Sequence, residues 1–137
     1  MSAARFLDTN ILLYAYDLDA PAKRTVALQL VAQGWTSPGD TAISVQVLQE
    51  MHVNLGKRGV PQAEATRIIR DFAVWPVVNN TLDLLQAALD EQARWKISLW
   101  DALILQSARQ LRCRTIWSED LNAGQAFGAT RVRNPFV

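Results

Sequence analysis

Short apolar segments alternate with longer amphipathic segments along this chain, and this alternation constrains the fold more than any other feature. Arg5–Leu7, Thr41–Ile43, Trp75–Val78 and Arg114–Trp117 are short and rich in β-branched or aromatic residues, which is typical of strands. Between them, apolar residues recur at helical spacing. This order of strands and helices predicts an α/β fold, in which helices cover both faces of a parallel sheet.

Capping and turn residues predict where the helices begin and end. Pro21 is well placed in the first turn of a helix, and Gly34 is a typical stop signal. Ser44, Asn80 and Ser98 are expected to cap the helices that follow them. The expected helices cover residues 11–16, 21–33, 45–56, 61–72, 81–95 and 99–112, and a last edge strand is expected around Val132.

The length and composition indicate one globular domain that spans residues 1–137. Half of the 137 residues are hydrophobic and 20% are charged, which argues against disorder. Cys113 is the only cysteine, so an internal disulfide is excluded and a reducing compartment is favoured. No apolar run approaches the ~18 residues of a membrane span, and the first residues do not resemble a leader. We therefore expect a soluble, cytoplasmic protein without a membrane partner.

Four acidic residues stand where a catalytic site can form. Asp8 directly follows the first expected strand, and Asp120 comes three residues after Trp117. The carboxyl ends of parallel strands are where such folds bind ligands. Asp101 lies in the most apolar expected helix, and Glu50 has apolar neighbours at helical spacing.

Each of these acids also has a purely structural interpretation. Asp8 can cap the next helix, and Asp101 has the spacing of a capping box with Ser98. Glu50 fits the edge of an exposed helix face, and Asp120 fits a solvated turn. Taken together the four acids favour a hydrolytic metal site, because Mg²⁺ and Mn²⁺ prefer a few carboxylates, water and substrate phosphate as ligands.

The order and spacing of several short motifs resemble PIN-domain ribonucleases, in particular the VapC-type toxins of bacterial toxin–antitoxin pairs. The resemblance covers almost the whole chain, and the opening motif and Asp101 in its helix are its most specific parts. Its motifs are Phe6–Leu12, Leu48–Glu50, Trp100–Ile104, Ser118–Asn122 with Gly124 and Gln125, and the closing Asn134–Phe136.

The resemblance implies a fold, a reaction and partners. The fold would be the PIN-like three-layer sandwich, with a parallel central sheet and helices on both faces. The reaction would be attack of water on an RNA phosphodiester, assisted by Mg²⁺ or Mn²⁺ and leaving a 5′-phosphate. The partners would be RNA, a second copy of the chain and a cognate antitoxin that inserts a segment into the cleft. The resemblance assigns catalysis and metal binding to Asp8, Glu50, Asp101 and Asp120, and supporting roles to Thr9, Ser118 and Asn122.

Charge and the remaining motifs leave some alternatives open. The net charge of +1 gives no argument for nucleic acid, but basic residues outnumber acids after Arg94, so Arg109 and Arg112 are candidates for phosphate contacts. With His52 as the only histidine, a two-histidine, metal-free ribonuclease is excluded. A Mg²⁺-dependent phosphotransfer domain would need a lysine after a late strand, where Ser118–Asp120 stands instead. A non-catalytic interaction module is disfavoured by the intact set of acids.

Overall fold

The computed structural model of the chain describes residues 2–121 and 124–137. Its helices and strands alternate in the order that the sequence predicts, and the strands are short. The elements in chain order are β1 (Arg5–Leu7), α1 (Thr9–Tyr14), α2 (Pro21–Thr36), β2 (Thr41–Ser44), α3 (Val45–Lys57), α4 (Gln62–Phe72), β3 (Val77–Val78), α5 (Leu82–Trp95), α6 (Leu99–Gln110), β4 (Thr115–Trp117), β5 (Ala126–Phe127) and β6 (Thr130–Arg133).

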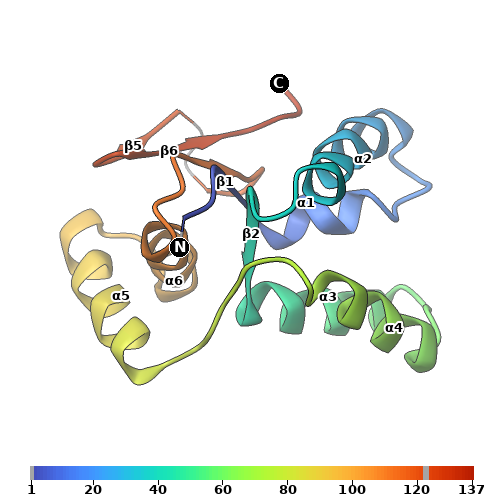
Figure 1. The fold of residues 1–137 in the computed structure, drawn as a ribbon, viewed down its shortest axis with the longest axis horizontal. Coiled ribbons are helices and arrows are strands. Elements are labelled where there is room, and N and C mark those ends of the chain that lie inside the picture. The colour runs from blue at the N-terminus through green and yellow to red at the C-terminus, as the bar shows by residue number, and fades with distance from the viewer. Residues whose placement is uncertain (1, 122–123) are drawn as a thin grey trace.

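The strands form one mostly parallel sheet, which confirms the predicted α/β class. Within the described residues the strand order is β3-β2-β1-β4-β6-β5, and only β5 pairs antiparallel. Strand β1 lies inside the sheet, with Phe6 opposite Ala42 on one side and Ile116 on the other. Helix α2 lies on one side of the sheet and α5 and α6 on the other, with α3 and α4 beside β2 and β3 (Figure 1). The carboxyl ends of β1 and β4 therefore point to one edge.

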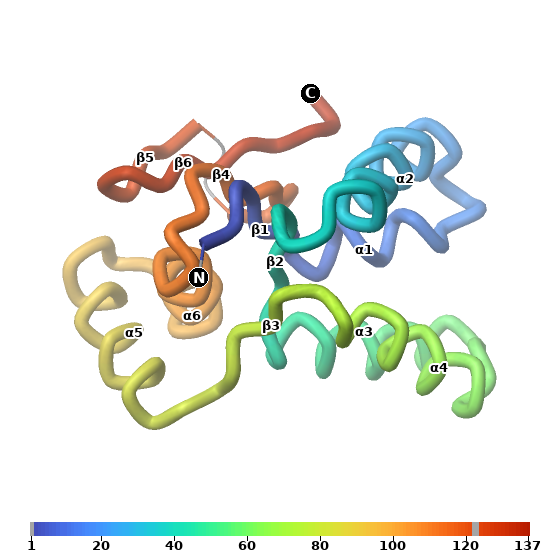
Figure 2. The backbone as a smooth tube through the Cα atoms, in the orientation of Figure 1, coloured from blue at the N-terminus to red at the C-terminus, as the bar shows by residue number. Residues whose placement is uncertain are grey.

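The core is formed where the apolar faces of these layers meet. Phe6, Ile11, Met51, Leu105 and Ile116 are fully buried and come from the sheet and from helices on both sides of it. The path of the backbone in Figure 2 shows that the C-terminal tail runs from β6 toward α2. No helix in the described part of the chain is both long and apolar enough to cross a membrane.

The first helix was expected over residues 11–16 but covers Thr9–Tyr14, and two further predicted helix ends were also wrong. Gly34 does not end α2, which continues to Thr36, and a Cβ atom at Gly34 would stand 2.3 Å from the Trp75 ring. The glycine is therefore needed for close packing rather than as a stop. Helix α5 is capped by Thr81, whose side chain accepts a hydrogen bond from Leu84 N, while Asn80 donates to Gln49 instead.

The end of the sheet also differs from the expectation. The strand around Val132 is present as β6, but it is not an edge, because it pairs with both β4 and β5. Strand β5 was not expected, since two residues carry too little pattern to be recognised in a sequence. The expected strand Trp75–Val78 is reduced to Val77 and Val78, which form β3 at the opposite edge, where a preceding proline is tolerated.

Candidate active site

The predicted acidic residues line one small cavity at the carboxyl edge of the sheet. It has a volume of about 110 Å³, and Asp8, Thr9, Glu50, Asp101 and Asp120 all line it. They come from the end of β1, the start of α1, the middle of α3, the first turn of α6 and the loop after β4. Residues up to 112 positions apart in the sequence thus share one cavity wall, as the strand-end argument predicts.

Asp8 is the most constrained of these acids. Its Oδ1 accepts a hydrogen bond from Thr9 N at 2.8 Å, which caps α1, and its Oδ2 accepts one from the Ser118 hydroxyl at 2.7 Å. The pKa of Asp8 is raised to about 6, because burial together with the charges of Glu50 and Asp120 outweighs the lowering effect of these hydrogen bonds. Asp8 can therefore cap α1 and also belong to the acidic cavity, because its two carboxylate oxygens bind different neighbours.

The loop after β4 is held so that Asp120 faces the cavity and Glu119 turns away from it. The Asp120 carboxylate accepts a hydrogen bond from Asn10 Nδ2 at 3.1 Å, and Asn10 Oδ1 accepts one from Glu119 N. Glu119 pairs with Lys23 at 2.5 Å and accepts a hydrogen bond from Tyr14, and the Lys23 contact lowers the pKa of the Glu119 carboxyl. On the other side of Asp120, the Ser118 hydroxyl accepts a hydrogen bond from Leu121 N, so the backbone is fixed on both sides.

Glu50 and Asp101 complete the cavity from two helices. Gln46, one turn before Glu50 in α3, donates a hydrogen bond from Nε2 to Glu50 Oε1 at 2.9 Å. The Ser98 hydroxyl accepts a hydrogen bond from Asp101 N at 3.0 Å, so the expected cap of α6 is present. Burial raises the pKa of the Asp101 carboxyl, and the charge of Asp120 raises it further.

The chemistry of the cavity fits a hard divalent cation that keeps part of its water shell. Within residues 2–121 and 124–137, no three acidic, histidine or cysteine side chains are grouped as a direct ligand set. However, two buried oxygens of residues in the cavity wall, Thr9 Oγ1 and Gln46 Oε1, have no hydrogen-bond partner among the described residues. Buried polar atoms are nearly always satisfied, so these oxygens indicate a ligand or ordered water. Mg²⁺ commonly takes only one or two protein carboxylates directly and retains several waters.

The structure adds two residues to the predicted site and corrects the role expected for Arg109. Asn122 lies outside the described residues. Gln46 and Asn10 were not singled out in the sequence, although Gln46 precedes Glu50 by one helical turn, the spacing at which side chains meet. Arg109 is not free for phosphate, because its guanidinium bonds Glu91 and the Phe127 carbonyl within the scaffold.

Comparisons with known proteins agree with this geometry. A family model described as the PIN domain matches residues 5–126. No curated protein matches the chain. A solved toxin–antitoxin complex from Klebsiella pneumoniae contains a chain that is 25% identical, with a TM-score of 0.69 over 97% of this chain and 98% of that one. The crystal structure of VapC20 from Mycobacterium tuberculosis, described as a toxin that cleaves the sarcin–ricin loop, is 23% identical, with a TM-score of 0.68 over 85% and 90%.

Proposed function

We propose that this chain, which belongs to the PIN-domain family, is a metal-dependent endoribonuclease and the toxin of a toxin–antitoxin pair. The observation that carries the proposal is the single cavity lined by Asp8, Glu50, Asp101 and Asp120. The near full-length likeness to a chain of the Klebsiella toxin–antitoxin complex supports the biological role.

In this proposal the four carboxylates would hold Mg²⁺ or Mn²⁺ at the carboxyl edge of the sheet, in part through water molecules of the ion's own shell. A bound ion of this kind supplies an activated water and offsets the charge that develops on the phosphate. Ser118 and Thr9 orient Asp8, Asn10 orients Asp120, and Gln46 orients Glu50 through the hydrogen bonds described above. The acids therefore arrive with fixed directions, which lowers the cost of organising the site when substrate binds.

The test of the proposal is cleavage of structured RNA by the purified protein, with Mg²⁺, with Mn²⁺ and with excess EDTA, followed by mapping of the cut ends. Asp8→Asn preserves the size of the side chain but removes its charge. If this costs ~4 kcal/mol of transition-state stabilisation, the rate falls about a thousandfold. Asp90→Asn, at an exposed carboxylate on α5, is the matched control and should keep full activity. Cleavage that persists in EDTA or in the Asp8→Asn protein contradicts the proposal.

The resemblance implies an antitoxin segment in the cleft, whereas the apolar surface that suits an antitoxin in this structure lies away from the carboxylate cavity. A groove of about 690 Å³ between α2 and α4 is lined by exposed apolar side chains, among them Tyr16, Leu28 and Trp35. Arg24 also lines this groove, and its Nε is buried with no partner among the residues described. An apolar antitoxin segment would cover the exposed side chains, and its polar residues would meet charges of both signs, because Asp71 lines the groove together with Arg24.

A second copy of the chain is the other proposed partner. Helices α5 and α6 lie on the side of the sheet away from α2 (Figure 1), and they expose Leu82, Leu85, Leu89 and Trp100. A shallow cavity between these helices, lined by Leu82, Leu85 and Leu103, extends the same apolar surface. Apolar patches of this kind mark interaction sites, and a homodimer buries the same patch on both copies.

A further inference from the structure

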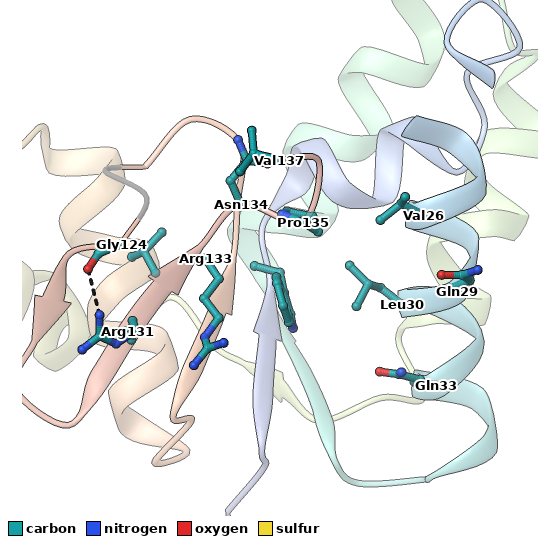
Figure 3. Close-up of a pocket in the computed structure, with 12 residues that line it drawn as sticks. Val26, Gln29, Leu30, Gln33, Gly124, Arg131, Arg133, Asn134, Pro135 and Val137 are labelled. Carbon is teal, nitrogen blue, oxygen red and sulfur yellow. Dashed lines mark hydrogen bonds between the residues drawn. The ribbon is translucent and has the colours of Figure 1, made fainter. Parts of the chain in front are cut away.

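A second groove lies on the opposite face of the sheet from α6, between α2 and β6. It has a volume of about 840 Å³ and is the cavity drawn in Figure 3. Gln29, Leu30 and Gln33 form its wall on α2, and Trp117, Arg131 and Arg133 line it from β4 and β6. None of these residues belongs to the carboxylate cavity, so the groove needs an explanation of its own.

Strand geometry places both arginines in this groove. Along β6, Thr130 and Val132 are buried, whereas Arg131 and Arg133 are exposed on the other face, because successive side chains of a strand point to opposite sides. The parallel register then sets Arg133 beside Trp117.

The arginines give the groove uncompensated positive charge. Arg131 donates a hydrogen bond to the Gly124 carbonyl, which is neutral. In the part of the chain that the structure describes, neither arginine forms an ion pair with a carboxylate, and no described acidic side chain lines the groove. The opposite wall presents the amide groups of Gln29 and Gln33, which donate and accept hydrogen bonds but carry no charge.

The groove is joined to the candidate active site through the backbone. Trp117 directly precedes Ser118, whose hydroxyl holds Asp8. Ser118 N also donates a hydrogen bond to the Arg133 carbonyl at 3.0 Å. One end of the groove therefore lies at the same edge of the sheet as the carboxylate cavity.

We propose that this groove binds a single-stranded stretch of the RNA substrate next to the phosphodiester that is cut, an inference that rests on the proposed function. The two arginines would contact successive phosphates. Trp117 and Leu30 offer an apolar surface for a base, and the glutamine amides match the polar edges of bases. An acidic peptide would satisfy the arginines but would leave the amides and the apolar surface without a matching partner.

The test measures binding directly, so that it does not depend on catalysis. A fluorescent oligoribonucleotide of about 12 nucleotides is titrated in EDTA over a salt series, using Arg131→Gln/Arg133→Gln. The control is Arg112→Gln/Arg114→Gln, which removes the same charge from a cavity next to Ser2 and Asp40, at the amino ends of the strands. The sequence suggested Arg112 as a phosphate contact, but this position lies at the end of the sheet opposite to the carboxylate cavity. We expect the groove variant to raise the Kd roughly tenfold and to reduce the salt slope by about 0.7 for each phosphate that an arginine no longer neutralises, and we expect the control to change little.

Two further measurements test whether the groove itself causes the change in Kd and whether its ligand is RNA or an acidic peptide. Gln29→Glu/Gln33→Glu alters only exposed positions of α2 and should also weaken binding, because it places negative charge on the opposite wall. Titration of an acidic peptide under the same conditions tests the other class of ligand that the two arginines could bind. Equal Kd values and salt slopes for the groove and control variants would overturn the inference, as would tighter groove-dependent binding of an acidic peptide than of RNA. Absence of cleavage by the wild type would overturn the proposed function alone.

Discussion

Burial and hydrogen bonding act in opposite directions on the Asp8 carboxylate, and burial prevails. Its pKa rises from 3.8 to about 6, whereas the unfolded chain retains the ordinary value. The folded protein therefore binds the extra proton between about pH 4 and pH 6, and the free energy of unfolding falls as the pH rises through that window. A rise of this size is worth at most about 3 kcal/mol.

This predicts a gain in stability when the charge of Asp8 is removed. In EDTA at neutral pH, Asp8→Asn should raise the melting temperature, and its stability should decline less than that of wild type between pH 4 and pH 6. The measurement is a set of thermal melts over this pH range, with Asp90→Asn as control. A pH dependence identical to wild type would show that Asp8 does not carry the unfavourable charge.

Asp101 gives an independent test of the metal site. The backbone N–H of Asp101 donates a hydrogen bond to the Ser98 hydroxyl, and the Asp101→Asn substitution leaves that contact in place. The substitution removes a carboxylate whose ionisation is disfavoured by burial and by the charge of Asp120. We expect melting in EDTA to be unchanged or higher for the variant. Addition of millimolar Mg²⁺ should stabilise wild type and should stabilise the variant much less. A variant that melts at a lower temperature than wild type in EDTA, yet shows the full increase in melting temperature with Mg²⁺, would assign a purely structural role to Asp101.

The role of Gln46 could not be predicted from the sequence. In the sequence it is a glutamine in an amphipathic helix, where the default is exposure, yet it is buried and bonds Glu50. Asp8 and Asp101 were identifiable because acids beside apolar runs are unusual. A neutral amide gives no such signal, and only the packing of α3 against the neighbouring elements reveals its role.

At the scale of elements, Gly34 is the clearest disagreement between sequence and structure. A glycine near the end of a helical pattern predicts a stop, but the ring of Trp75 packs against α2 at this point, between Trp35 and Phe72. Strands and helices were otherwise predictable in kind, because their periodicities differ. Their ends were not, because a cap such as Thr81 competes with its neighbour Asn80 through tertiary contacts.

The packing at Gly34 predicts opposite outcomes for two glycine substitutions. Gly34→Ala should lower the free energy of unfolding by about 1–3 kcal/mol, because its Cβ would overlap a buried ring. Gly56→Ala in α3 has no atom within 4 Å of the new Cβ and should raise it by about 0.5–1 kcal/mol through helix propensity. Urea denaturation of both proteins measures the difference. Stabilisation by both substitutions would mean that the Trp75 ring moves freely.

At the scale of the whole molecule, the sequence predicts well which acidic residues lie close together. It predicts less well which charged side chains are available to bind a partner. Convergence follows from topology, since parallel strands bring their carboxyl ends to one edge whatever the loops do. Surface charge does not follow in this way. Arg109 and Arg131 look alike in the sequence, but Arg109 is engaged by Glu91, whereas Arg131 lies on an exposed strand face.

The exposed surface of α5 and α6 leads to a prediction about assembly. Leu82, Leu85 and Leu89 recur on one face of α5, and Trp100, 66% exposed, belongs both to this surface and to the wall of the carboxylate cavity. A second copy that packs here would bury that apolar area and enclose one side of the site. Leu89→Glu places a charge within this surface and should convert a dimer to a monomer in sedimentation velocity, with an unchanged far-UV circular dichroism spectrum.

Val74→Glu is the matched control for this experiment, because Val74 is also an exposed aliphatic residue but follows α4, away from α5 and α6. It should leave the dimer intact. If dimerisation completes the site through Trp100, the Leu89→Glu monomer should also cleave RNA more slowly than wild type, and activity of the wild type should fall on dilution below the dimer dissociation constant. A wild-type protein that sediments as a monomer would contradict the dimer, and a Leu89→Glu protein that remains a dimer would show that another surface mediates self-association. In either case Trp100 would line the carboxylate cavity without taking part in a dimer interface.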